Sequence, residues 1–310
     1  MDISVIIPVK DGEAYIKTCL DSVFNQTFEG EYEVIVGVDP SSDHTFEIVE
    51  SYKKDHPNLI VEHRRGLGVS INRIDSVKRS KGRYICFLDG DDYYTPNYLK
   101  VMFNEIEKGY DAVNCSFYVD RDGKIEKNSF TLDGELSSLE ACKAVLKDSY
   151  IRGFLWTKMF KRELFELDPL PIFKAKDAMF EDTILIYYQA MNFSKAKCIS
   201  VPLYYYRDNK SGATKKEKKS RYEYHLKAFA FIRHLCDENP NPEYLKGFRE
   251  TLLRSKASLW FDKLVSRHVL TKDDVKALRP LYEAITGKEK LDINKFGMKE
   301  YIEDLYRPID

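Results

Sequence analysis

Apolar runs alternate with segments of helical spacing along the first 120 residues. The runs are short and rich in β-branched residues, which is typical of strands buried in a parallel sheet. They predict strands over residues 3–9, 32–38, 59–62, 83–88 and 112–119. The intervening segments place apolar residues on one helical face and predict helices over 13–24, 41–54, 69–80 and 97–108. This alternation predicts a doubly wound α/β domain with a mostly parallel sheet and flanking helices.

Polar clusters follow the predicted strands directly. In open α/β sheets, ligands bind beyond the carboxyl ends of the strands, so these positions are the candidates for a site. The clusters are Lys10 with Asp11, Asp39 with Ser41 and Ser42, Arg64 with Arg65, and the run Asp89, Gly90, Asp91, Asp92. Acidic and basic groups are therefore expected to converge on one rim of the sheet.

The strand–helix rhythm weakens after about residue 119. Asp122-Gly123 predicts a hairpin turn, and further helices are expected over 138–147, over 162–167 and from Glu181 onward. Residues 201–207 predict a strand, and the chain is helical and rich in Lys and Glu from about residue 215. We therefore expect a catalytic domain over 1–215 and a helical region over 216–310 that docks an acceptor or forms an oligomer.

Composition narrows the class of protein. The chain has 49 Lys and Arg residues against 50 Asp and Glu, and a near-neutral balance argues against a dedicated nucleic-acid binder. No apolar stretch approaches the ~20 residues of a membrane span, and the first residues lack the basic segment of a secretory signal. The six cysteines are scattered without metal-ligand spacing. A protein of the reducing cytoplasm is expected.

The sequence Asp89-Gly90-Asp91-Asp92 is the strongest local signal for chemistry. Three carboxylates in four residues repel one another unless a positive charge lies among them. Mg²⁺ and Mn²⁺ prefer carboxylate and phosphate oxygens, and a usual Mg²⁺ arrangement combines one or two carboxylates with a diphosphate. The alternative is an acidic turn that caps the following helix through Asp92 or Thr95.

The order of these motifs resembles family 2 glycosyltransferases of the GT-A fold. The resemblance spans about residues 3–214, and its pieces occur in the family's order. They are ISVIIPV with the helix ending in SVFNQT, then YEVIVGVDPSSDHT, GVSINR, GRYICFLDGDDYYTPNYL, FEDTILIYY and PLYYYR.

The resemblance implies roles for individual residues in donor binding. Asp39 corresponds to the acid that binds the nucleotide base, Asp89 lies near the ribose, and Asp91, with Asp89, holds the metal. Arg73 and Arg207 correspond to arginines that face the diphosphate. The nucleotide site is further implied to include Pro8, Asp11 and Gly90. The residues alone leave other interpretations open: a helix cap for Asp39, a surface arginine for Arg73 and a surface loop for Arg207.

A second acidic pair, Glu181-Asp182, begins an apolar helical run. A helix N-terminus favours the ionised form of a carboxyl group, so capping is one interpretation. The resemblance makes Asp182 the catalytic base and Glu181 a residue that positions the acceptor or orients the base. It also implies acceptor contacts for Trp156 and Asp92, although core packing is an equal alternative for Trp156.

The resemblance implies an inverting glycosyltransferase that depends on Mn²⁺ or Mg²⁺. The implied donor is a nucleotide-diphosphate sugar, with a UDP-sugar favoured, and the implied acceptor is a bacterial surface glycan or glycolipid. A nucleotidyltransferase would open with a Gly-rich basic loop, which PVKDGEAY is not. A non-catalytic scaffold stays open because Val38, Pro40 and Ile74 depart from the family pattern. The basic run 215–221 is compatible with anionic acceptors, with peripheral contact to lipid headgroups, or with a solvated loop.

Overall fold

The computed structural model describes residues 1–66, 68–128, 132–147, 151–167, 181–209, 219–254, 270–292 and 295, with the backbone alone at 219–224, 253 and 254. The chain forms two compact units. The sheet unit comprises Met1–Ser137, Phe154–Asp177 and Phe193–Lys210. The helical unit comprises Ser138–Gly153, Ala178–Asn192 and Ser211–Asp310.

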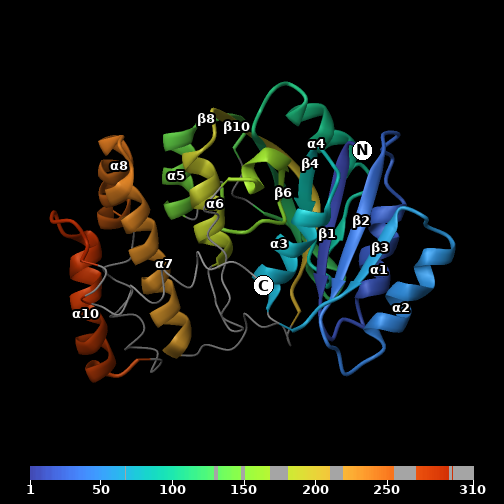
Figure 1. Ribbon diagram of the computed structural model, residues 1–310, viewed down its shortest axis with the longest axis horizontal. Helices are drawn as coiled ribbons and strands as arrows, with labels where there is room; N and C mark the ends of the chain where they lie inside the picture. The colour runs from blue at the N-terminus through green and yellow to red at the C-terminus, as the bar shows by residue number, and fades with distance from the viewer. Residues whose placement is uncertain are drawn as a thin grey trace. The chain divides into compact units, whose positions relative to one another are not determined.

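One sheet organises the sheet unit (Figure 1). Its strands lie in the order β3 (Leu59–His63), β2 (Tyr32–Val38), β1 (Ile3–Val9), β4 (Tyr84–Phe87), β9 (Lys158–Lys161), β6 (Ala112–Arg121), β10 (Lys195–Arg207) and β5 (Tyr93–Tyr94). The strands β3, β2, β1 and β4 are parallel, whereas β9 runs antiparallel between β4 and β6. Two further strands pair outside this order: β7 (Lys124–Lys127) with β6, and β8 (Gly134–Ser137) with β10.

The predicted α/β class is confirmed. The strands predicted over 3–9 and 32–38 have those bounds in the structure, and the Asp122-Gly123 turn joins β6 to β7. Both turn residues have positive φ values, 52° and 89°, which suit a tight hairpin. The strands β5, β8 and β9, which are two to four residues long, have no counterpart among the predicted strands.

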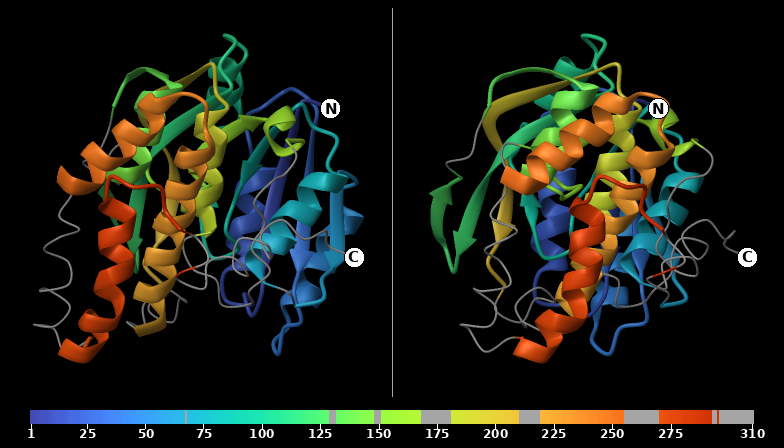
Figure 2. Two further views of the ribbon diagram at one scale, coloured as in Figure 1. Left: turned by 60° about the vertical axis from the view of Figure 1, so that its left-hand side comes forward. Right: turned by 90° about the vertical axis from the view of Figure 1, so that its left-hand side faces the viewer.

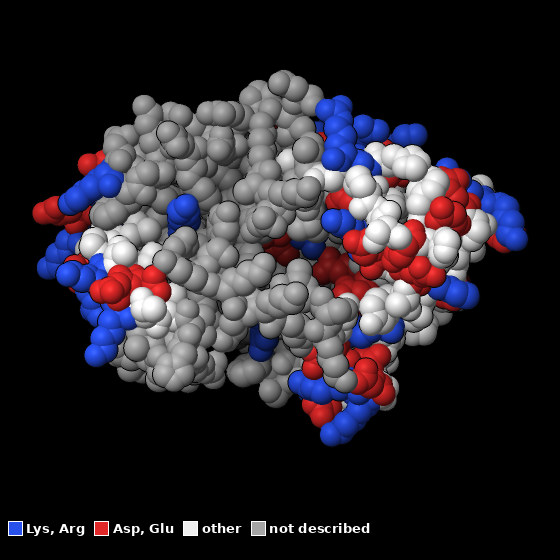
Figure 3. All heavy atoms as spheres, turned by 90° about the horizontal axis from the view of Figure 1, so that it is seen from below, with Lys and Arg blue, Asp and Glu red and all other residues white. Residues whose placement is uncertain are grey.

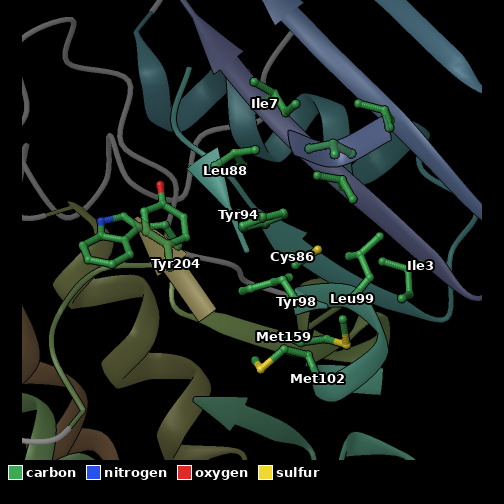
Figure 4. Packing of buried hydrophobic residues seen from close by; sticks show 14 of the residues in the cluster. Ile3, Ile7, Cys86, Leu88, Tyr94, Tyr98, Leu99, Met102, Met159 and Tyr204 are labelled. Carbon is green, nitrogen blue, oxygen red and sulfur yellow. The ribbon is translucent and has the colours of Figure 1, made fainter. Parts of the chain in front are cut away.

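Helices cover both faces of the parallel strands. The helices of this unit are α1 (Ile16–Phe24), α2 (Thr45–Ser51), α3 (Val69–Arg79) and α4 (Tyr98–Ile106). Alternate residues of β1, among them Ile3 and Ile7, pack in a buried cluster with Leu99 and Met102 of α4 (Figure 4). Helix α3 packs against β1 and β2. Burial of both faces explains why these strands are mostly apolar, and their two buried polar residues, Ser4 and Glu33, are hydrogen-bonded to each other.

The helical unit contains α5 (Ser138–Lys147), α6 (Glu181–Met191), α7 (Lys219–Glu238), α8 (Pro242–Arg254) and α10 (Lys272–Thr286). Helices α7 and α10 lie side by side (Figure 2). The guanidinium of Arg233, fully buried in α7, donates to the carbonyls of Ile285 and Gly287 at 2.9 Å and pairs with Asp237 at 3.0 Å. These bonds satisfy the carbonyls at the end of α10, which would otherwise lack partners.

The two units interleave along the sequence, because α5 and α6 group with the C-terminal helices. The predicted boundary at residues 215 and 216 lies outside the described residues and stays a prediction. Among the described helices, none is long and apolar enough to cross a membrane.

Gly37 allows the close approach of β2 and α3. The side-chain amide of Asn72 donates to the Gly37 carbonyl at 2.8 Å. A β-carbon at position 37 would overlap Asn72 Oδ1 and lie 2.8 Å from Arg64 Nε. An added carbon there must displace both side chains.

We therefore expect Gly37→Ala to destabilise the protein by about 1–3 kcal/mol, the usual cost of overpacking. Thermal unfolding followed by circular dichroism measures this as a lower Tm. The matched control is Gly134→Ala in β8, where the nearest atom to an added β-carbon is 4.0 Å away. Equal Tm values for the two variants would contradict the packing argument.

Candidate functional site

The carboxyl ends of β1, β2, β4 and β10 carry the residues that the sequence singled out. The ends of β1 and β2 are joined directly, since the Asp39 amide donates to the Val9 carbonyl at 2.9 Å. Figure 3 views the molecule from below Figure 1, the side toward which β1 runs, and acidic side chains gather on the described part of this face. The predicted convergence of polar residues on one rim is therefore present in the sheet unit.

Two loops of this rim are fastened to each other. The amide of Asp11 donates to Ser41 Oγ at 3.0 Å, and Asp11 Oδ1 accepts from the Ser42 amide at 2.7 Å. Further along, the Glu13 amide donates to Asp43 Oδ2 at 2.9 Å. Asp11 has a φ of 48°, a left-handed conformation that Asp tolerates better than most residues. Asp11 thus orders the β2–α2 loop through its own carboxylate.

Asp39 lies at the end of β2 and is 8% exposed. Its Oδ1 accepts from the backbone amide of Gly66 at 3.1 Å, and its Oδ2 lies 3.4 Å from the side-chain nitrogen of Asn72. The carboxylate therefore faces the β3–α3 loop and α3 and does not cap α2. Asn72 was not predicted as a site residue, and no spacing in the sequence indicates this contact.

Arg73 and Asp89 form an ion pair of 2.7 Å. Arg73 is 5% exposed, so it is a buried residue of α3 and not a surface arginine. A buried guanidinium needs a compensating anion, and Asp89 supplies it. The first carboxylate after β4 is thereby neutralised from within the sheet unit.

Asp91 and Asp92 differ in their surroundings. Asp91 is partly buried, and its Oδ2 accepts from the Asn209 amide group at 3.3 Å. Burial, and next the charge of Asp89, raise the pKa of Asp91. Burial raises the pKa of Asp92 well above its usual value, with added repulsion from Asp91 and Asp89. The loop therefore carries negative charge that the surrounding protein only partly compensates.

Asp92 is 1% exposed, and both of its oxygens accept hydrogen bonds. Tyr204 Oη donates to Oδ2 and the Arg207 amide donates to Oδ1, each at 2.7 Å. The predicted contact of Asp92 with an acceptor stays a prediction. Gly90 lets this loop sit against β1, because an added β-carbon would lie 2.8 Å from Val9 Cγ2. Pro8, the residue before Val9, lies within β1.

Arg207 and Trp156 occupy different environments. The Arg207 guanidinium lies over two tyrosine rings, 4.9 Å from the centroid of Tyr15 and 5.2 Å from that of Tyr93. Trp156 is 5% exposed and stacks on Phe154 and Tyr204, with centroid distances of 4.4 Å to each. In the sheet unit Trp156 packs as a core residue, and its predicted stacking on a sugar stays a prediction.

The carboxylates of Asp89 and Asp91 are the type of ligand that a hard divalent cation prefers. Within the part of the chain that the structure describes, no group of three or more His, Cys, Asp or Glu side chains is arranged to hold a metal ion. Asp89 and Asp91 supply two hard oxygen donors, and Mg²⁺ sites commonly take the remaining ligands from substrate phosphates and water. Burial, and next the charge of Asp89, raise the pKa of Asp91, and a bound cation would offset both. These residues fit the predicted ion.

Glu181 and Asp182 belong to the helical unit, where they form the first turn of α6. Thr183, the next residue, packs against Gly153, where a β-carbon would overlap the Thr183 hydroxyl. The assignment of Asp182 as base and Glu181 as its partner stays a prediction. The residues of the basic run 215–221 lie outside the described side chains.

A family model described as "Glycosyl transferase family 2" matches residues 4–167, just over half of the chain. The chain belongs to glycosyltransferase family 2. The resemblance carried by the sequence motifs is thereby confirmed, and the protein is a glycosyltransferase.

Two curated glycosyltransferases are similar in sequence to this family 2 chain. Putative glycosyltransferase EpsH of Bacillus subtilis is 25% identical over 264 residues, which cover 83% of this chain and 75% of EpsH. Poly(ribitol-phosphate) beta-glucosyltransferase of Bacillus spizizenii is 41% identical over 107 residues, which cover 34% of this chain and 17% of that protein.

Two solved structures confirm the predicted GT-A fold of the family 2 chain. Residues 1–349 of S. aureus TarS in complex with UDP-GlcNAc match with a TM-score of 0.73 and 22% identity, covering 92% of this chain and 82% of that one. The mannosyltransferase PcManGT of Pyrobaculum calidifontis, in complex with GDP-Man and Mn²⁺, matches with a TM-score of 0.54 and 18% identity, covering 98% and 85%.

The raised pKa of Asp91 predicts a cost to the stability of the ligand-free glycosyltransferase. Because the folded state holds the Asp91 proton more tightly than the unfolded chain does, stability falls as pH rises from 3.8 through the folded pKa. We expect Asp91→Asn to raise the Tm at pH 7 by roughly 1–3 °C.

Thermal unfolding between pH 3 and 8 measures this effect, and the gain should vanish as pH approaches 3. Asp55→Asn, which removes an acid exposed to solvent, is the control and should change the Tm less. A lower Tm for Asp91→Asn at neutral pH would show that the carboxylate stabilises the ligand-free fold.

Proposed function

We propose that this protein transfers a sugar from a UDP-sugar to a hydroxyl group of a bacterial surface glycan or glycolipid, with inversion and with Mn²⁺ or Mg²⁺. The observation that carries the proposal is the carboxylate loop Asp89–Asp92 at the end of β4, in the same sheet unit as Asp39 and Arg207. TarS binds UDP-GlcNAc, which supports the choice of donor. The similarity to the poly(ribitol-phosphate) glucosyltransferase supports a surface polymer as acceptor.

Asp39 is proposed to bind the nucleotide base. A carboxylate offers about four acceptor positions, and the Gly66 amide and the Asn72 side chain occupy two of them. Acceptor capacity is left for a ring N–H of the base. The fastened loops that carry Asp11 and Ser42 hold this end of β2 in place before the donor arrives.

Asp91, with Asp89, would hold the cation. When bound, the ion stabilises the negative charge that develops on the departing diphosphate. Arg207 is proposed to bind diphosphate oxygens, because a guanidinium presents paired donors that match them. Because the guanidinium packs over the rings of Tyr15 and Tyr93, its N–H groups can point in few directions.

Asp182 is proposed to accept the proton of the acceptor hydroxyl. The oxygen attacks the anomeric carbon while the bond from that carbon to the diphosphate oxygen breaks, and the nucleoside diphosphate leaves with the electron pair. A single in-line displacement inverts the centre. The first turn of α6 favours the ionised form of Asp182, which the role requires.

We expect UDP with Mn²⁺ to raise the Tm of the protein, since a ligand that binds only the folded state stabilises it by about 2.7 kcal/mol at 100 times its Kd. A thermal-shift panel of UDP, GDP, CDP and TDP, each with and without Mn²⁺, measures this. Asp91→Ala should abolish the Mn²⁺-dependent part.

A rise in Tm with another nucleotide, and none with UDP, would overturn the UDP assignment. Val38 and Pro40, which depart from the family pattern beside Asp39, would then be the residues to test for the choice of base. No shift with any nucleotide would favour the non-catalytic scaffold. The control Glu140→Gln changes a first-turn acid of α5 and should leave the UDP response unchanged.

We expect Asp182→Asn to lower kcat by roughly 10²–10⁴-fold, the usual contribution of a general base. The shift given by UDP and Mn²⁺ should stay at the wild-type value, because Asp182 is not proposed to bind the nucleotide. Turnover of UDP-sugars by Asp182→Asn at the wild-type rate would reject this base, and Glu181→Gln then becomes the next variant to assay.

A further inference from the structure

Tyr204 connects β10 to the carboxylate loop through one hydroxyl group. The side chain is fully buried, and Oη donates to Asp92 Oδ2 at 2.7 Å. The same oxygen accepts from the Asp89 amide at 3.3 Å. A single group thus bonds the loop at its first and its last residue, although Tyr204 lies 112 positions beyond Asp92 in the chain.

Asp92 completes the connection from the other side. Its Oδ1 accepts from the Arg207 amide at 2.7 Å, so the two carboxylate oxygens bond two positions of the same strand end. Residues 204 and 207 are the tyrosine within and the arginine at the end of β10. The position of the Arg207 backbone is therefore tied to the carboxylate loop.

Packing leaves the Tyr204 hydroxyl little choice of direction. The ring belongs to the buried cluster of the sheet unit (Figure 4) and stacks on Trp156 at 4.4 Å. It also meets Tyr94 edge-on at 5.7 Å, and Tyr94 is its register partner in β5. Removal of the hydroxyl alone would leave this packing intact, since Phe retains the ring.

We propose that Tyr204 and Asp92 are positioning residues that hold Asp89, Asp91 and Arg207 in one arrangement for the metal–diphosphate group. This inference rests on the proposed function, because it assigns Asp91 to the cation and Arg207 to the diphosphate. Asp92 is assigned to neither group, because it is 1% exposed and both of its oxygens face β10.

The proposal follows from the charge of the loop. Asp89, Asp91 and Asp92 repel one another, and repelling groups separate unless other bonds restrain them. The Tyr204 hydroxyl and the Arg207 amide provide that restraint without adding positive charge. The loop is held in place while its charge is still available to a cation.

The first test needs no ligand. In Tyr204→Phe, the amides of Asp89 and Arg207 should exchange hydrogen roughly tenfold faster. The Asp89 amide loses its acceptor, and Asp92, which accepts from the Arg207 amide, loses the Tyr204 donor that holds it. Hydrogen-exchange mass spectrometry of the two segments that contain these amides measures the rate. The matched control is Tyr205→Phe, which removes the hydroxyl of the next residue, a group with no hydrogen bond to any part of the chain that the structure describes.

The second test measures the cation. With UDP present, Tyr204→Phe should raise the Mn²⁺ concentration that gives half of the thermal shift by roughly tenfold, and Tyr205→Phe should not. Saturating Mn²⁺ should restore the full shift. Asp92→Asn, which keeps an acceptor for the Arg207 amide, should raise this Mn²⁺ concentration less than Tyr204→Phe does. It replaces Tyr204→Phe in the test if that variant folds poorly.

The outcomes separate this inference from the proposed function. If wild-type protein shows no response to UDP and Mn²⁺, the proposed donor site fails, and the exchange rates alone still test the connection. If wild-type protein responds but Tyr204→Phe matches Tyr205→Phe in both exchange and Mn²⁺ titration, the positioning role is overturned.

Discussion

Repulsion among the carboxylates at the end of β4 is the constraint around which the sheet unit is arranged. Asp89 is neutralised by a buried arginine of α3. Asp92 is satisfied by neutral donors of β10. Asp91 accepts from the side-chain amide of Asn209, and its burial, with the charge of Asp89, raises its pKa. Three adjacent acids of similar intrinsic acidity therefore have three different environments, and the environment follows from which strand or helix each one faces.

These environments depend on strands that are distant in the sequence. β10 runs parallel to β6, and its end pairs with β5, the two-residue strand that follows the carboxylate loop. The loop thus leaves β4 at one position of the sheet and re-enters the sheet beside β10. Because contacts across more than a hundred residues must form before the acids are satisfied, the loop depends on the whole sheet for its conformation.

The hydrophobic pattern of the sequence predicts the buried strands. It does not predict features that depend on which strands pair and in which register. Buried parallel strands such as β1 are mostly apolar, so even their bounds follow from the pattern. The motif PLYYYR predicts a strand, but only the register of Tyr204 with Tyr94 decides which tyrosine faces the acids. The contact of Asn72 with Asp39 is invisible for the same reason, since it joins a helix to a strand end 33 residues earlier.

The nucleoside part and the diphosphate part of the proposed donor site therefore differ in how far they are ordered and charge-balanced before the donor binds. On the nucleoside side, Asp11 and Asp39 already have hydrogen-bond partners, and the loops that carry them are fastened, so little ordering is required when a base binds. On the diphosphate side, Tyr204 holds the loop in position, while the charge of Asp91 is only partly compensated. A bound cation would remove that cost, which couples binding of the metal–diphosphate group to the stability of the sheet unit.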